Sequence, residues 1–100
     1  MGQQFADQYS FLHFSVGVVA YFWRVKLGWW LVLHTLFELG ENSPAGMQLI
    51  NRVNAWPGGK PQPDSMVNIV GDTAFAMVGW MAACALDRVG DRYGWYKRHL

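Results

Sequence analysis

The stretch LGWWLVLHTLFELGENSP, residues 27–44, decides how this chain folds. It begins as an apolar run and then brings in His34, Glu38 and Glu41. These three residues are four and three positions apart, so they share one face of a helix. The stretch therefore predicts an apolar helix, centred on residues 27–39, that carries a polar stripe.

Two further apolar segments, residues 9–23 and 66–86, lie on either side of it in a chain of 100 residues that is 52% hydrophobic. At about 1.5 Å per residue, the segment 66–86 extends roughly 30 Å, which is the thickness of a bilayer core. The other two are shorter, and runs of that length also occur in the cores of soluble helical bundles. Because apolar residues surround each segment instead of forming one stripe, we expect an all-α integral membrane protein with three membrane-embedded helices.

A short fourth helix is predicted between the second and third segments. Ser43 is a good helix cap and Pro44 favours the first helical position, so residues 44–55 are expected to form a helix in the membrane interface. The Pro- and Gly-containing stretch 56–65 is expected to be a loop, and residues 87–100 a polar tail. The chain as a whole is expected to be one membrane domain.

The positive charges predict an orientation. Six of the eight Lys and Arg residues lie after the first segment or near the C-terminus: Arg24, Lys26, Arg88, Arg92, Lys97 and Arg98. Because cytoplasmic loops carry the excess of positive charge, we expect the N-terminus and the 40–65 loop outside and the C-terminus in the cytoplasm. The membrane would be a bacterial inner membrane or its equivalent. A net charge of +1 without a basic stripe argues against nucleic acid as a partner.

A second polar stripe opens the third apolar segment. Its members are one helical turn apart: Asp64, Asn68 and Asp72. Counted along the helices, Glu38 lies at the same depth as His13, and Glu41 at the same depth as Asp72. Charged groups in hydrocarbon are costly unless they are paired, so these side chains are expected to turn inward and meet.

At these positions the chain resembles an uncharacterised family of bacterial inner-membrane proteins, with a looser similarity to VanZ-like membrane proteins. Two motifs carry the resemblance: Phe37-Glu38-x-x-Glu41-Asn42-Ser43 and Asp64-Ser65-x-x-Asn68-x-x-x-Asp72. It covers roughly residues 11–85, and Phe37, Pro63 and Ile69 depart from the family pattern. The resemblance implies a helical membrane fold and these motif positions, but it implies no reaction.

Two interpretations of the polar residues are open. In the first they form a structural core that joins helices by hydrogen bonds, with His13, Asn42, Arg52 and Asn68 among its members. Asp64 then serves mainly as the N-cap of the third segment. Gly71, Gly79 and Ala83 permit close helix contact, either with another subunit or within the chain.

In the second interpretation the same region is a cation site. Glu38, Glu41, Asp64 and Asp72 offer oxygen ligands for Mg²⁺, Mn²⁺ or Ca²⁺. The candidate catalytic residues are His34, Glu38, Glu41 and Asp72, because a histidine beside carboxylates can act as a general base.

The first interpretation leads to the expected function. We expect an accessory or structural subunit of a larger membrane assembly, with the bilayer and other membrane subunits as partners. The alternative is a cation-dependent membrane enzyme or binding protein for a lipid-linked phosphate, which Arg52 would help to hold.

Overall fold

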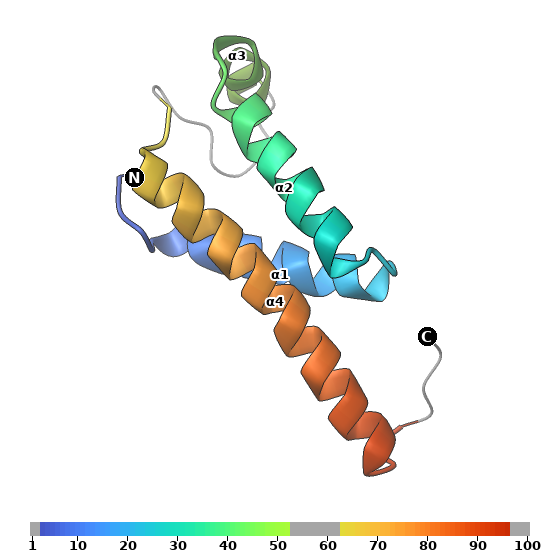
Figure 1. The fold of residues 1–100 in the computed structure, drawn as a ribbon. Helices are drawn as coiled ribbons and strands as arrows, with labels where there is room; N and C mark the ends of the chain where they lie inside the picture. The colour runs from blue at the N-terminus through green and yellow to red at the C-terminus, as the bar shows by residue number, and fades with distance from the viewer. Residues whose placement is uncertain (1–2, 53–62, 97–100) are drawn as a thin grey trace.

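The computed structural model describes residues 3–52 and 63–96, which form four α-helices and no strand within those ranges. The helices are α1 (Gln8–Phe22), α2 (Leu27–Glu41), α3 (Pro44–Arg52) and α4 (Met66–Arg92) (Figure 1). The predicted all-α class is confirmed.

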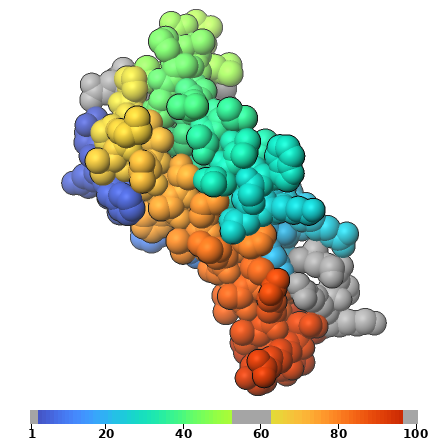
Figure 2. Space-filling view, viewed as in Figure 1, coloured from blue at the N-terminus to red at the C-terminus, as the bar shows by residue number. Residues whose placement is uncertain are grey.

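Helix α4 is the axis on which α1 and α2 pack (Figure 1). The indole N–H of Trp30 in α2 donates to the carbonyl oxygen of Ala76 at 3.1 Å, whereas His34, one turn further along α2, lies against Thr73. Helix α2 is therefore antiparallel to α4. The molecule is elongated, 48 × 23 × 22 Å, and the second half of α4 projects beyond α2 (Figure 2).

Glycines let α1 and α4 approach closely. A Cβ atom at Gly79 would overlap the carbonyl oxygen of Phe14, and one at Gly17 would overlap that of Ala76. Gly71 meets the backbone of Phe5 in the same way. Because Phe5 precedes Phe14 as Gly71 precedes Gly79, α1 runs parallel to α4. The close helix contact that was predicted for Gly71 and Gly79 is thus made within the chain. The third predicted contact residue, Ala83, is buried as well.

Serine hydroxyls cap two of the helices. The Ser43 hydroxyl accepts from the backbone N–H of Gly46 at 3.1 Å, which confirms the predicted start of α3. At α4 the cap is Ser65, whose hydroxyl accepts from the backbone N–H of Asn68 at 3.2 Å. The prediction that Asp64 caps this helix is therefore wrong.

Helix α4 extends beyond the predicted apolar segment. It continues past residue 86 to Arg92, so the first residues of the predicted polar tail are helical. Asp87, the first of them, is only 3% exposed and accepts hydrogen bonds from Tyr21 and Tyr96.

Three predictions lie wholly or partly outside the described residues. They concern the last residues of the interfacial helix, 53–55, most of the loop, 56–62, and the basic residues Lys97 and Arg98.

The predicted three crossings are supported at only one helix. Within the described ranges, α4 alone is long and apolar enough to cross a membrane. Helices α1 and α2 have 15 residues each, or roughly 22 Å, which is shorter than a bilayer core.

The described part of the molecule has a polar interior and an apolar exterior. The buried polar or charged residues are Ser10, His34, Glu38, Asn68, Asp72 and Asp87. The buried hydrophobic residues are small, apart from Tyr21. Large apolar side chains such as Phe11 and Leu36 are instead more than half exposed, at 75% and 59%. This distribution is the reverse of that in a soluble domain.

Candidate metal centre

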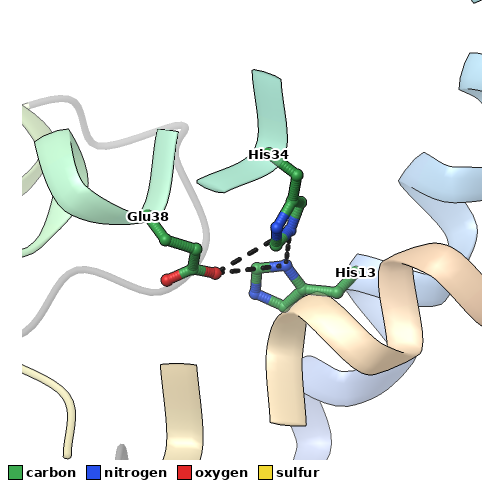
Figure 3. A group of neighbouring side chains, drawn as sticks. All are labelled: His13, His34 and Glu38. Atoms are coloured by element: carbon green, nitrogen blue, oxygen red, sulfur yellow. Dashed lines mark hydrogen bonds and ion pairs between the residues drawn. The ribbon is translucent and has the colours of Figure 1, made fainter. Parts of the chain in front are cut away.

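Three helices bring the predicted polar residues together. Helix α1 contributes His13, and α2 contributes His34 and Glu38 (Figure 3). Helix α4 contributes Asp72, whose carboxylate contacts His13. His34 and Glu38 are one helical turn apart and are 3% and 1% exposed. The cluster therefore lies inside the helix packing, as the matching depths predicted.

Three potential ligand atoms converge in this cluster, as Figure 3 shows. His13 Nδ1 lies 2.9 Å from His34 Nε2, and Glu38 Oε1 lies 3.6 Å and 3.8 Å from these two nitrogens. Ligands that hold Zn²⁺ tetrahedrally at 2.0–2.1 Å are about 3.3 Å apart. The three separations bracket that value, so the atoms form a triangle of the size that a small transition-metal ion requires.

The other nitrogen of each imidazole meets an oxygen on α4. His13 Nε2 lies 3.2 Å from Asp72 Oδ2, and His34 Nδ1 lies 3.3 Å from Thr73 Oγ1. Metal-binding histidines nearly always use their second nitrogen in this way, because the outer hydrogen bond fixes the tautomer and orients the ring. The arrangement thus provides the outer contacts of a metal centre as well as its inner triangle.

A second group of acidic side chains adjoins the triangle. Carboxylate oxygens of Glu38, Asp64 and Asp72 lie within 4.8 Å of one another. Asp72 is 3% exposed, and its Oδ1 atom has no hydrogen-bond partner among the described residues. A buried carboxylate oxygen in that state is expensive, and a nearby cation would satisfy it.

Asn42 holds the acidic group in place. Its amide donates to the backbone oxygen of Glu38 at 2.8 Å and to Glu38 Oε2 at 3.3 Å. Its side-chain oxygen accepts from the backbone N–H of Asp64 at 2.8 Å. Asn42 therefore fastens the residue before the α4 cap to the end of α2, which confirms it as part of the polar core.

Three predicted site residues lie elsewhere. Glu41, the last residue of α2, is half-buried beside α3 and is in neither group of potential ligands. Arg52 is exposed at the end of α3, so its predicted place in the polar core is wrong. Asn68 is buried, but it donates to the backbone oxygen of Gln4 at 2.6 Å and to Asp7 Oδ2 at 3.2 Å. It therefore joins α4 to the N-terminal segment, not to α2.

One contact of the cluster was not predicted. Thr73 is a neutral residue next to Asp72, and no spacing marks it as the partner of a histidine on another helix. The approach of Glu38 to both imidazoles agrees with the sequence, because His34 and Glu38 are four residues apart on one helix face and Glu38 was placed at the depth of His13.

No protein family, curated protein or solved structure gives a match to this chain. Its function must therefore be argued from the site itself.

Proposed function

We propose that this chain is an integral membrane protein that binds a transition-metal ion through His13, His34 and Glu38. The observation that carries the proposal is the triangle of ligand atoms together with an outer oxygen on each imidazole. The same three atoms are joined by a hydrogen bond between the two imidazoles and by contacts of both rings with Glu38, and a bound metal ion would replace these contacts.

The ligand set indicates the class of metal. Two imidazole nitrogens and one carboxylate suit Zn²⁺, Fe²⁺ or Mn²⁺, whereas Mg²⁺ and Ca²⁺ prefer oxygen ligands alone. Of the cations expected from the sequence, Mn²⁺ fits best, and Zn²⁺ joins the candidates because of His13 and His34. Three protein ligands leave a coordination position for water or a substrate, as in catalytic zinc sites.

The membrane location rests on the distribution of side chains. A cluster with buried charge inside and large apolar residues outside is what a bilayer favours, because polar groups must meet each other away from lipid. We place α4 across the membrane, with α1 and α2 embedded beside it and α3 in the outer interface. The basic residues Arg24, Lys26, Arg88 and Arg92 then favour a cytoplasmic position for the α1–α2 turn and the end of α4.

A structural subunit of a larger membrane assembly is the second candidate. It is favoured by the exposed apolar faces of the helices, which another subunit could cover as well as lipid could. The resemblance to the uncharacterised inner-membrane family is compatible with both candidates.

Metal titration of two glutamine variants tests the proposal. Protein purified in detergent is stripped with a chelator and titrated with Zn²⁺, and the bound metal is measured by elemental analysis. We expect one ion per chain in the wild type and in Glu41→Gln, and a loss of binding in Glu38→Gln. The two variants are matched, because each neutralises one acid of α2 and only Glu38 is in the triangle.

Equal binding by both variants would refute the assignment of the ligands. If the wild-type protein, correctly folded by circular dichroism, takes up none of Zn²⁺, Mn²⁺ and Fe²⁺, the structural subunit becomes the better account.

A further inference from the structure

We infer that a cavity between α1 and α2 binds the hydrocarbon chain of a membrane lipid and brings that lipid against the two metal-binding imidazoles. The inference rests on the proposed function, because it takes the membrane location and the metal centre as given. It adds the chemical class of the ligand that reaches the centre.

The cavity is a consequence of how the helices pack. Helices α1 and α2 both pack mainly on α4 and contact each other little, which leaves a space of about 300 Å³ between them. Its apolar lining comes from both helices: Leu12, Val16, Trp30, Leu33 and Phe37. His13 and His34 complete the lining, so the cavity and the metal centre share two residues.

The cavity opens on the apolar exterior of the molecule. Val16 on α1 and Leu33 on α2 are 42% and 48% exposed, and both lie in its wall. Water gains little from an apolar space of this kind, whereas an apolar ligand gains contacts with every wall. A volume of about 300 Å³ is also at the lower end of the range for small-molecule sites.

The position of the cavity selects a lipid chain as its occupant. Its exposed wall residues, Val16 and Leu33, are apolar and belong to the apolar exterior of the molecule. With the proposed membrane location that exterior faces the hydrocarbon of the bilayer, so an acyl chain is the apolar group that lies next to the cavity. Because the chain would lie against His13 and His34, the lipid phase has a direct route to the metal ion.

Photolabelling in vesicles tests the inference. The protein is reconstituted in phosphatidylcholine vesicles that contain a small fraction of phosphatidylcholine with a diazirine on one acyl chain. After irradiation, labelled residues are located by mass spectrometry. We expect several-fold more label at Leu33, in the cavity, than at Val32, which is 46% exposed on the same helix outside it.

Filling the cavity provides the second arm of the test. Val16→Trp should remove the excess label at Leu33, whereas Val19→Trp should leave it, because Val19 is 44% exposed on α1 outside the cavity. Bound Zn²⁺ shows that each variant is folded. If Val16→Trp does not fold, Leu12→Trp serves as a second variant that fills the cavity.

The outcomes separate this inference from the proposed function. Equal label at Leu33 and Val32 in protein that binds Zn²⁺ would overturn the lipid site alone, and so would an excess that persists in folded Val16→Trp. A cross-link from Leu33 to a second protein chain would also overturn it. Absence of label at every exposed apolar position of α1 and α2 would overturn the membrane location as well.

Discussion

Two buried polar clusters lie at different levels of α4, and they differ in what their carboxylates contact. At Asp87 both oxygens accept hydrogen bonds from phenols, Tyr21 at 2.6 Å and Tyr96 at 2.8 Å. In the His13–His34–Glu38–Asp72 cluster the carboxylates instead face imidazoles, and one Asp72 oxygen has no hydrogen-bond partner among the described residues.

The difference separates a structural contact from a candidate site. Phenol hydroxyls donate to both oxygens of the Asp87 carboxylate, and Gly94, with φ at 69°, forms the turn that brings Tyr96 back to it. Such a contact joins α1, α4 and the residues that follow α4. The other cluster gathers imidazole nitrogens and carboxylate oxygens, which are the atoms that bind metal cations in proteins. A buried acid is therefore not by itself a functional signal in this protein.

The largest expected effect is the loss of stabilisation by metal in Glu38→Gln. An ion present at 100 times its dissociation constant stabilises the wild-type protein by about 2.7 kcal/mol, because it binds the folded state alone. Thermal unfolding with Zn²⁺ and with a chelator should show this gain in the wild type and none in the variant. Tyr21→Phe, which alters only the Asp87 cluster, should keep the full gain. Its loss in Tyr21→Phe would mean that the two clusters are not independent.

Removing an outer contact should weaken the metal centre without abolishing it. Thr73→Val deletes the hydroxyl beside His34 Nδ1, and loss of such a partner typically lowers metal affinity about 10–100-fold. Competition with a chromogenic chelator measures the change. Thr35→Val is the control, because Thr35 is exposed on α2. Unchanged affinity in Thr73→Val would show that Thr73 does not orient the ring.

The Asp87 cluster is expected to affect stability alone. Tyr21→Phe removes one donor and should lower the free energy of unfolding by about 1 kcal/mol in detergent, with no change in metal affinity. The comparison is Tyr93→Phe, since Tyr93 is 67% exposed and should be neutral. A change in metal affinity, or equal stability losses in both variants, would contradict the structural role.

The smallest effect is expected at Arg52. Arg52→Gln should change the free energy of unfolding by no more than about 0.5 kcal/mol and leave Zn²⁺ affinity unchanged, because the side chain is exposed at the end of α3. Chemical unfolding and the same chelator competition measure both quantities. A tenfold loss of affinity would restore Arg52 to the polar core.

Helix positions and the site residues of α2 were predictable because local rules govern them. The spacing of His34 and Glu38 places both on one face, and Ser43-Pro44 defines the start of α3. Contacts between helices were harder to predict from the sequence. His13 reaches the triangle because α1 lies close on α4, and that closeness depends on glycines whose partner surfaces are distant in sequence.

The wrong predictions have a common physical cause. Hydropathy compares only neighbouring residues along the chain, so it could not detect that Tyr21 donates to Asp87 from 66 positions away. Similarly, the sequence could not reveal that Asp64 precedes the actual cap, Ser65. In both cases hydrogen bonds that only the folded structure reveals determine the position of a polar side chain: the phenol of Tyr21 at Asp87, and the Ser65 hydroxyl at the start of α4.

X-ray absorption at the zinc edge tests the central claim most directly. Protein loaded with Zn²⁺ should show two imidazole nitrogens and at least one oxygen at about 2.0–2.1 Å, and the imidazole signal should fall by half in His34→Ala. Coordination by oxygen alone, or a spectrum that His34→Ala leaves unchanged, would contradict a metal centre built from His13, His34 and Glu38.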